Sequence, residues 1–212
     1  MNKKLLKNRN YMLLVIGNFI SLLGSNIQQF VLSLYVLSIT GSATLFASML
    51  AVSILPRILL SPVAGVFGDW FDKKKAIVIL DIANAIFLFG FAAIIYYQGD
   101  VSIFIIYILV IILEITEVFF QSAMSVVLPS VVDKEDYLEA NSLRVMLVSF
   151  GQLMGPIIGA ILFSSFGLMI AVLINGMSFL LSAISELFIY IPKIKEKTTK
   201  LSLPQFKKEF IS

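Results

Sequence analysis

Long apolar runs separated by short polar breaks dominate the pattern along this chain of 212 residues. A helix needs about 20 consecutive apolar residues to cross a bilayer core about 30 Å thick. The runs are continuous rather than alternating, which excludes the strands of a membrane β-barrel and favours an all-α integral membrane protein. The pattern predicts six transmembrane helices, at residues 11–39, 45–67, 76–97, 101–128, 143–163 and 168–191.

The breaks between these helices are of two kinds. Those at residues 40–42, 98–100 and 164–167 are short and carry turn-forming residues. The other connections and the two ends of the chain hold almost every lysine and arginine. Because cytoplasmic loops carry an excess of these residues, we expect both termini in the cytoplasm and a multi-pass protein of the plasma or inner cell membrane. Residues 1–191 would form the transmembrane bundle and residues 192–212 a basic cytoplasmic tail.

Composition narrows the class of function. Hydrophobic residues make up 59% and charged residues 14% of the chain, whereas a soluble domain carries about 25% charged residues. A soluble globule and a nucleic-acid-binding domain are therefore excluded. Cysteine and histidine are both absent, so neither a metal centre nor a nucleophile–histidine pair is expected, and no phosphate-binding loop motif occurs. We expect no enzyme, no cofactor and no metal, and any transport would be driven by an ion gradient.

The connection after the second expected helix reads GVFGDWFDKKK at residues 65–75. A short glycine-containing turn with aspartate and lysines suits a moving hinge. The Asp69 carboxylate can accept hydrogen bonds at the N-terminus of a neighbouring helix, where the helix dipole is positive. The alternative is an ordinary basic loop. The candidate gating residues are Gly65, Asp69, Lys73 and Lys74.

The fifth expected helix carries a glycine at every fourth position. Gly151, Gly155 and Gly159 would form one flat stripe along which another helix backbone can approach closely. Pro156 removes one intrahelical hydrogen bond and bends the helix. The groove and the bend favour a gating or packing surface, and plain helix–helix packing is the alternative.

Ionisable residues inside the spans each need an explanation, because an unpaired charge at the membrane centre costs roughly 2.5–3.5 kcal/mol on insertion scales. At 1.5 Å per residue, Arg57 and Glu117 each lie about 16–18 Å from the basic ends of their helices, near the middle of the membrane. Glu114 shares a helix face with Glu117. We expect Arg57 to pair with one of these carboxylates, which leaves the other free to take up a proton and couple it to transport. A purely structural ion pair is the alternative.

Two further acids lie nearer the basic side. Asp81 is about 9 Å inside the membrane. We expect it to pair with Arg144 or with the connection at residues 65–75, in a structural or gating role rather than in contact with a substrate. Glu186 lies near the inner end of the last helix and can extend toward the lysines of the tail. We assign Glu186 no functional role.

Three segments together resemble the major facilitator superfamily. Residues 65–75 are similar to its loop signature G-x-x-x-D-R-x-G-R-[KR], with Trp70 in place of Arg and Asp72 in place of Gly. Residues 128–143 resemble the stretch LP-x-L-V-x-x-x-x-L-x-x-A-N-S-L of the exporter branch that includes macrolide efflux proteins and the enterobactin exporter. Residues 151–160 resemble the signature G-x-x-x-G-P-x-x-G-G of drug:proton antiporters, with Ala as the last residue.

The resemblance implies the N-terminal six-helix half of a twelve-helix fold, built as an inverted repeat of three plus three helices. It implies a proton-coupled exporter of amphipathic small molecules, drug-like or siderophore-like. The expected partners are membrane lipid, the substrate, the proton and a second six-helix half, covalently joined or in a dimer. The alternatives are a truncated or inert half that acts only as a subunit, and an importer of lipid or nutrient with the same fold.

The resemblance also implies that the first helix lines a central cavity. Asn26 and Gln29 are polar, uncharged and three residues apart in that helix. They are therefore candidates to offer hydrogen-bonding groups to a substrate. Hydrogen bonds between neighbouring helices are the alternative role.

Overall fold

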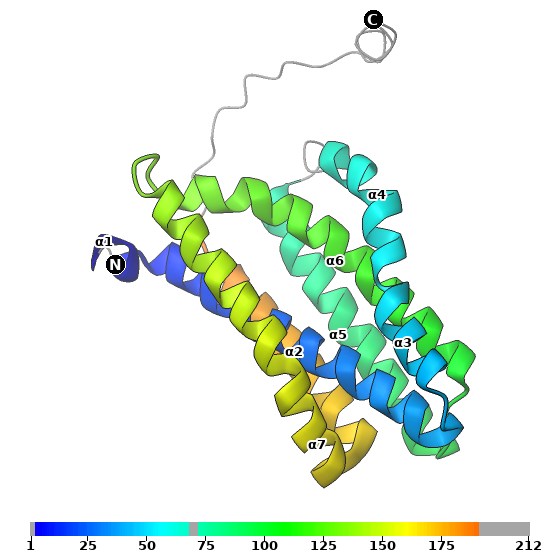
Figure 1. Cartoon of the computed structure of the whole chain (residues 1–212). Helices are drawn as coiled ribbons and strands as arrows, with labels where there is room; N and C mark the ends of the chain where they lie inside the picture. Colours follow the sequence, from blue (N-terminus) through cyan, green and yellow to red (C-terminus); the bar gives the residue numbers. More distant parts are fainter. Residues whose placement is uncertain (1–2, 68–71, 191–212) are drawn as a thin grey trace, which may run out of the picture.

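The computed structural model describes residues 3–67 and 72–190, and every regular element in these ranges is an α-helix (Figure 1). Five segments are long and apolar enough to cross a membrane, with α3 and α4 together forming one of them. The prediction of an all-α membrane protein is therefore confirmed at this level. The helices are α1 Lys3–Lys7, α2 Arg9–Thr40, α3 Ala43–Val52, α4 Ile54–Phe67, α5 Lys73–Gln98, α6 Ile103–Val131 and α7 Tyr137–Leu187.

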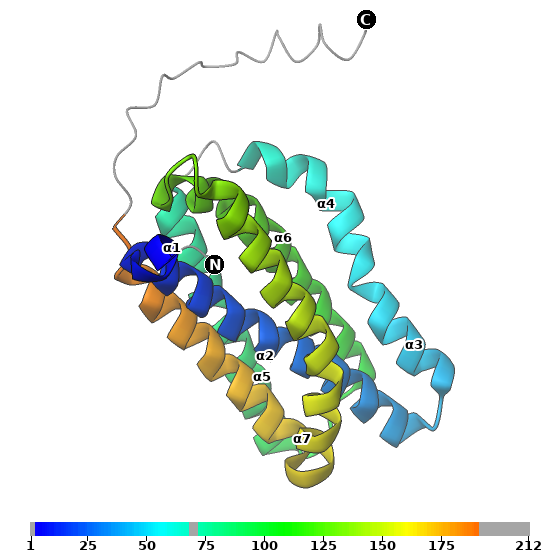
Figure 2. The same cartoon turned by 60° about the vertical axis from the view of Figure 1, so that its left-hand side comes forward.

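Helix α7 combines the two last helices expected from the sequence. It has 51 residues and is interrupted by non-helical backbone at Gly167, where φ is 73° and ψ is −173°. Essentially only glycine adopts this conformation. The chain doubles back within α7, so that a first arm (residues 137–166) and a second arm (residues 168–187) run in opposite directions (Figures 1 and 2). The sequence predicts a break over residues 164–167, and in the structure the non-helical backbone is confined to Gly167.

The second expected helix is divided between α3 and α4 at Ser53. Proline explains the position of this break. Pro56 has no N–H to donate to the carbonyl of Val52, four residues earlier, and its ring crowds that carbonyl. Pro62 lies inside α4, where the Ser61 hydroxyl donates to the carbonyl of Ile58 at 3.5 Å, the group that Pro62 leaves without its helical donor.

One end of the bundle gathers α1, the end of α4, the start of α5, the α6–α7 connection and the end of α7 (Figure 2). We call it the basic end because it holds Lys4, Lys74 and Lys134. Side chains tie its segments together. Lys4 lies 2.8 Å from a carboxylate oxygen of Asp133, and this contact, together with Asp136, raises the pKa of Lys4.

Two hydrophobic clusters fill the bundle, one toward each end. The cluster at the basic end includes Tyr11, Ile77 and Phe120, and the other cluster includes Val31 and Leu88. The residues that lie between the clusters along the helices are polar and buried. Among them are Asn18, Ser21, Asp81, Asn84, Ser182 and Glu186. We call this stratum the polar layer.

Helix α2 passes between the two arms of α7 (Figure 2), and glycines permit the close approach on both sides. A Cβ atom at Gly155 in the first arm would lie 2.6 Å from the Cβ of Asn26 and 3.0 Å from its carbonyl carbon. A Cβ at Gly159 would lie 3.0 Å from the carbonyl oxygen of Ile27. On the other side, a Cβ at Gly24 of α2 would overlap the side chain of Asn175 in the second arm. The glycine stripe of the fifth expected helix is therefore a contact with the α2 backbone.

Substitution of Gly155 by alanine is expected to lower the free energy of unfolding by about 1–3 kcal/mol, because the added methyl group meets backbone that has little room to move. The matched control is Gly90→Ala in α5, since a Cβ at Gly90 meets nothing within 4 Å. The control should be neutral or stabilising by up to ~1 kcal/mol through its higher helix propensity. Denaturant unfolding in detergent, followed by circular dichroism, measures both. Equal losses in the two variants would contradict the close-approach argument.

Candidate functional site

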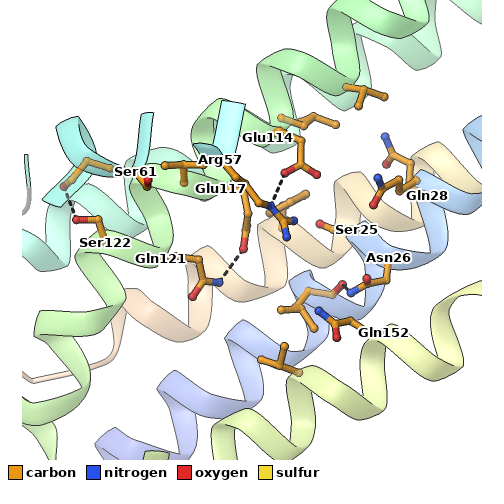
Figure 3. Close-up of a pocket in the computed structure, with 18 of the residues that line it drawn as sticks. Ser25, Asn26, Gln28, Arg57, Ser61, Glu114, Glu117, Gln121, Ser122 and Gln152 are labelled. Carbon is orange, nitrogen blue, oxygen red and sulfur yellow. Dashed lines mark hydrogen bonds and ion pairs between the residues drawn. The ribbon is translucent and has the colours of Figure 1, made fainter. Parts of the chain in front are cut away.

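A cavity of about 600 Å³ opens beside α2 and is lined by α2, α4, α6 and both arms of α7 (Figure 3). Apolar residues such as Leu113 and Phe179 form part of its wall. It lies at the depth of the polar layer, so polar side chains from all these helices also reach it. The polar lining residues are Ser25, Asn26, Gln28, Gln29, Arg57, Ser61, Glu114, Glu117, Gln121, Ser122, Ser125, Arg144, Gln152 and Asn175.

The structure brings Arg57 of α4 and Glu114 of α6 together. The Nε atom of Arg57 donates to an oxygen of Glu114 at 3.1 Å (Figure 3). The Glu114 side chain is only 12% exposed, whereas that of Arg57 is 56% exposed on the open side of the cavity. This is one of the two pairings expected from depth along the helices. Whether the pair has a role in transport stays a prediction at this point.

Glu117 lies one turn further along α6 and is held differently. Its carboxylate accepts a hydrogen bond from the amide of Gln121 at 2.7 Å (Figure 3). The other end of that amide accepts from the guanidinium of Arg144 in the first arm at 2.9 Å. Glu117 is thus linked to a cation through one intervening amide and is not directly bonded to Arg57. The cavity contains two carboxylates and two guanidinium groups, whose charges balance when all four groups are ionised.

Arg144 was one of the two partners expected for Asp81, but in the structure its guanidinium is bonded to Gln121 instead. Arg144 does not pair with Asp81, because it lies in the first arm on the cavity side. Asp81 is on α5 and faces Ser182 of the second arm instead. Asp81 is 1% exposed and does not line the cavity.

Glu186 is wholly buried, at 0% exposed. The tail lysines toward which it was expected to extend lie outside the described residues. Both carboxylate oxygens of Glu186 lack a hydrogen-bond partner among the described residues. The rotation of the second arm explains the burial of Glu186, because it turns the face bearing Ser182 and Glu186 toward α5. Sequence reasoning missed this group, although the spacing of four between the two residues places them on one face of a helix.

The two substrate candidates in α2 line the cavity but have partners of their own. The amide of Asn26 donates to the carbonyl of Leu22 at 2.8 Å, within its own helix. The amide of Gln29 donates to the hydroxyl of Ser53 at 2.8 Å, which joins α2 to the break between α3 and α4. The Gln29 bond matches the alternative role of bonding neighbouring helices, whereas the Asn26 bond stays within α2. Contact with a substrate stays a prediction for both residues.

Gln28 is a lining residue that the sequence did not single out. Its side-chain oxygen accepts a hydrogen bond from the amide of Asn175 in the second arm. The Ser178 hydroxyl donates to the oxygen of that Asn175 amide at 2.9 Å. The Nε2 atom of Gln28 is buried and has no partner among the described residues. The Nε2 atom of Gln28 is therefore a hydrogen-bond donor held in place at the cavity wall. Nothing in the sequence indicated it, because no local pattern connects Gln28 with Asn175, which is far away in the chain.

The motif residues occupy other positions. Gly65 lines the cavity near the end of α4. Lys73 and Lys74 begin α5 at the basic end, where the ammonium group of Lys74 donates to the carbonyl of Leu187 at 2.8 Å. Asp69 lies outside the described residues, as do residues 192–212. Gly151, Gly155 and Gly159 face α2, and Pro156 lies beside them inside the first arm.

A double-mutant cycle with Arg57→Met and Glu114→Gln should give a coupling energy of about 1 kcal/mol, a value limited by the exposure of the arginine. The cycle that combines Arg57→Met with Glu117→Gln is the control. It should give a smaller coupling energy, because the Glu117 carboxylate bonds to Gln121. Denaturant unfolding in detergent measures all the variants. A larger coupling energy in the control cycle would overturn this assignment of partners.

Comparison with known proteins gives a consistent result. Residues 14–212 match the family model described as Major Facilitator Superfamily. Macrolide efflux protein A of Streptococcus pyogenes is 25% identical over 193 residues, which cover 91% of this chain and 47% of that protein. Macrolide efflux protein A of Enterococcus faecalis is 25% identical over 169 residues, covering 80% of this chain and 51% of that protein.

A third relative, described as an uncharacterized MFS-type transporter, YkuC, comes from Bacillus subtilis (strain 168). It is 27% identical over 191 residues, which cover 88% of this chain and 43% of that protein. The chain thus spans about half the length of the curated relatives it matches. No solved structure gives a significant match.

Proposed function

The chain belongs to the major facilitator superfamily, a family of membrane transporters and not of enzymes, and on that premise we propose that it forms the N-terminal half of a proton-coupled exporter. The substrates proposed are amphipathic small molecules, drug-like or siderophore-like. The observation that carries the proposal is the cavity of about 600 Å³. Its wall combines apolar side chains with balanced charges at mid-depth, so it suits a molecule with both an apolar body and a polar or charged group.

The proposed topology has six membrane crossings, with each arm of α7 crossing separately. Support comes from length, because the second arm, residues 168–187, is about 30 Å long and matches a bilayer core. In the proposed orientation the basic end faces the cytoplasm, together with both termini. Prolines lie inside α4, at Pro62, and inside the first arm, at Pro156. This correspondence supports an inverted repeat of three plus three helices.

Proton coupling is assigned to the carboxylates of the cavity. When Glu114 and Glu117 are ionised, they balance Arg57 and Arg144. A proton on Glu117, the carboxylate that Arg57 does not bond, leaves the cavity with an excess positive charge. A cationic group on a substrate would be bound most strongly when both carboxylates are ionised. Proton and substrate therefore compete for the same negative charges, which is the requirement for exchange of one for the other across the membrane.

A second six-helix half is proposed to close the cavity, either as a continuation of the same polypeptide or as a partner subunit. The chain covers about half of its relatives, and Arg57 is exposed on the open side of the cavity. Large apolar side chains flank this side on two helices. Leu59 of α4 is 71% exposed, and Leu153 of the first arm is 72% exposed. The competing functions are an inert half and an importer of the same fold.

Expression of the whole protein should lower the accumulation of an amphipathic fluorescent cation in cells, and collapse of the proton gradient should abolish the effect. The Glu117→Gln variant is expected to lose at least about tenfold in efflux rate, equivalent to about 1.4 kcal/mol, because it cannot exchange a proton. Asp100→Asn, in the exposed turn after α5, is the matched control and should transport normally. Raised accumulation would indicate an importer, and unchanged accumulation an inert half.

The topology has a separate test. Because the sequence contains no cysteine, labelling by a maleimide reports on the introduced cysteine. Ser165→Cys, at the exposed end of the first arm of α7, should react with a membrane-impermeant maleimide added to intact cells. Lys134→Cys, in the exposed connection between α6 and α7, should react only after the membrane is opened. Labelling of both positions from the same side would contradict a separate crossing by the first arm.

A further inference from the structure

A second pair of acids lies outside the cavity, where α5 packs against the second arm of α7. Asp81 of α5 is 1% exposed and Glu186 of the second arm is 0% exposed. The two carboxyl groups are close enough to act on one another electrostatically. Neither residue lines the cavity that contains Arg57 and Glu114. The pair is thus a distinct cluster at the basic side of the polar layer.

Polar groups in this cluster lack partners among the described residues. The unpartnered atoms are both oxygens of Glu186 and one oxygen of Asp81. Ser182 is itself 0% exposed and faces Asp81. Buried polar groups are nearly always hydrogen-bonded, so a cluster of carboxylate oxygens without partners indicates that a proton, an ion or another ligand binds there.

Among residues 3–67 and 72–190, the charged groups around the cluster do not neutralise it. From α6, the charged group that acts on Asp81 is Glu117, another acid. The ammonium group of Lys74 is bonded to the carbonyl of Leu187, and the guanidinium of Arg144 to Gln121. The sequence of α2, which packs on the second arm, contains only one charged residue, Arg9, which is exposed at the start of that helix.

Two ionised carboxylates cannot remain in this environment. Burial of a single unpaired charge costs several kcal/mol or more, and two like charges facing each other add their repulsion. A hard metal ion in an oxygen site takes about six or more ligands. No group of three or more acidic side chains in residues 3–67 and 72–190 could hold a metal ion. A proton satisfies a carboxyl pair without further ligands.

We propose that Asp81 and Glu186 form a proton-binding site between α5 and the second arm of α7, separate from the cavity. One proton from water bonds to one carboxylate oxygen, and the charge of the pair changes from −2 to −1. The carboxylic acid then donates to the facing carboxylate or to Ser182. Loss of the proton leaves two negative charges opposed across the helix contact. The protonated pair therefore holds α5 against the second arm, and deprotonation loosens this contact.

Infrared spectroscopy of the whole protein in lipid vesicles at neutral pH tests the proposal. A protonated carboxyl group gives a carbonyl stretch that carboxylates and amides do not give, and that shifts in heavy water. The difference spectrum between the wild type and the double variant D81N/E186Q should contain this band. The control D100N, at an exposed turn, should leave the band unchanged. The double variant is required because either acid alone would still be buried and protonated.

Two results would overturn the proposal. A wild type with no carbonyl stretch that shifts in heavy water would exclude a protonated site without the need for any variant. A difference spectrum that shows only loss of carboxylate bands would mean that both acids are ionised and balanced by a bound metal cation. Neither result depends on transport, so the proton site and the exporter proposal can fail independently.

Discussion

The passage of α2 between the two arms of α7 is the constraint on which the rest of the structure depends. Glycines on the first arm admit the α2 backbone from one side, and Gly17 and Gly24 of α2 admit the second arm from the other. This close packing sets the rotation of α2. It directs Asn26, Gln28 and Gln29 toward the cavity. The same packing explains why Gly167 must reverse the chain so tightly, since both arms have to contact a single helix along its length.

The polar layer is the second feature that the packing creates. An apolar cluster lies on either side of it, so polar groups within it have little water and must find partners in neighbouring helices. Asn84 does so with Thr116, and Gln28 does so with Asn175. Among the described residues, the buried groups without partners include the Nε2 atom of Gln28 and the Nε atom of Arg144 at the cavity, and the acid pair between α5 and α7.

Depth along the membrane is readable from the sequence, because the rise per residue of a helix is constant. This is why Arg57 and Glu114 were expected at one level and are found in contact. The direction in which a side chain points around its helix depends on how that helix is rotated against its neighbours, and local spacing does not determine it. Arg144 and Asp81, one of the pairings expected from the sequence, lie on different sides of the bundle for this reason. The glycine stripe was recognisable, whereas its partner α2 was not.

Glu117 connects the two acidic clusters. On one side it is influenced by Arg57 and Arg144 and is bonded to Gln121. On the other side its charge acts on Asp81 across the contact between α6 and α5. A negative charge on Glu117 favours a proton on the Asp81–Glu186 pair, and a proton on Glu117 removes that influence. In the proposed mechanism the effect is reciprocal by linkage, so the protonation state of the pair would change the affinity of the cavity for a cation. A chain with no histidine could thus couple the protonation of a cavity to that of a helix contact through carboxylates alone. The coupling requires the polar layer to hold these carboxylates at one depth.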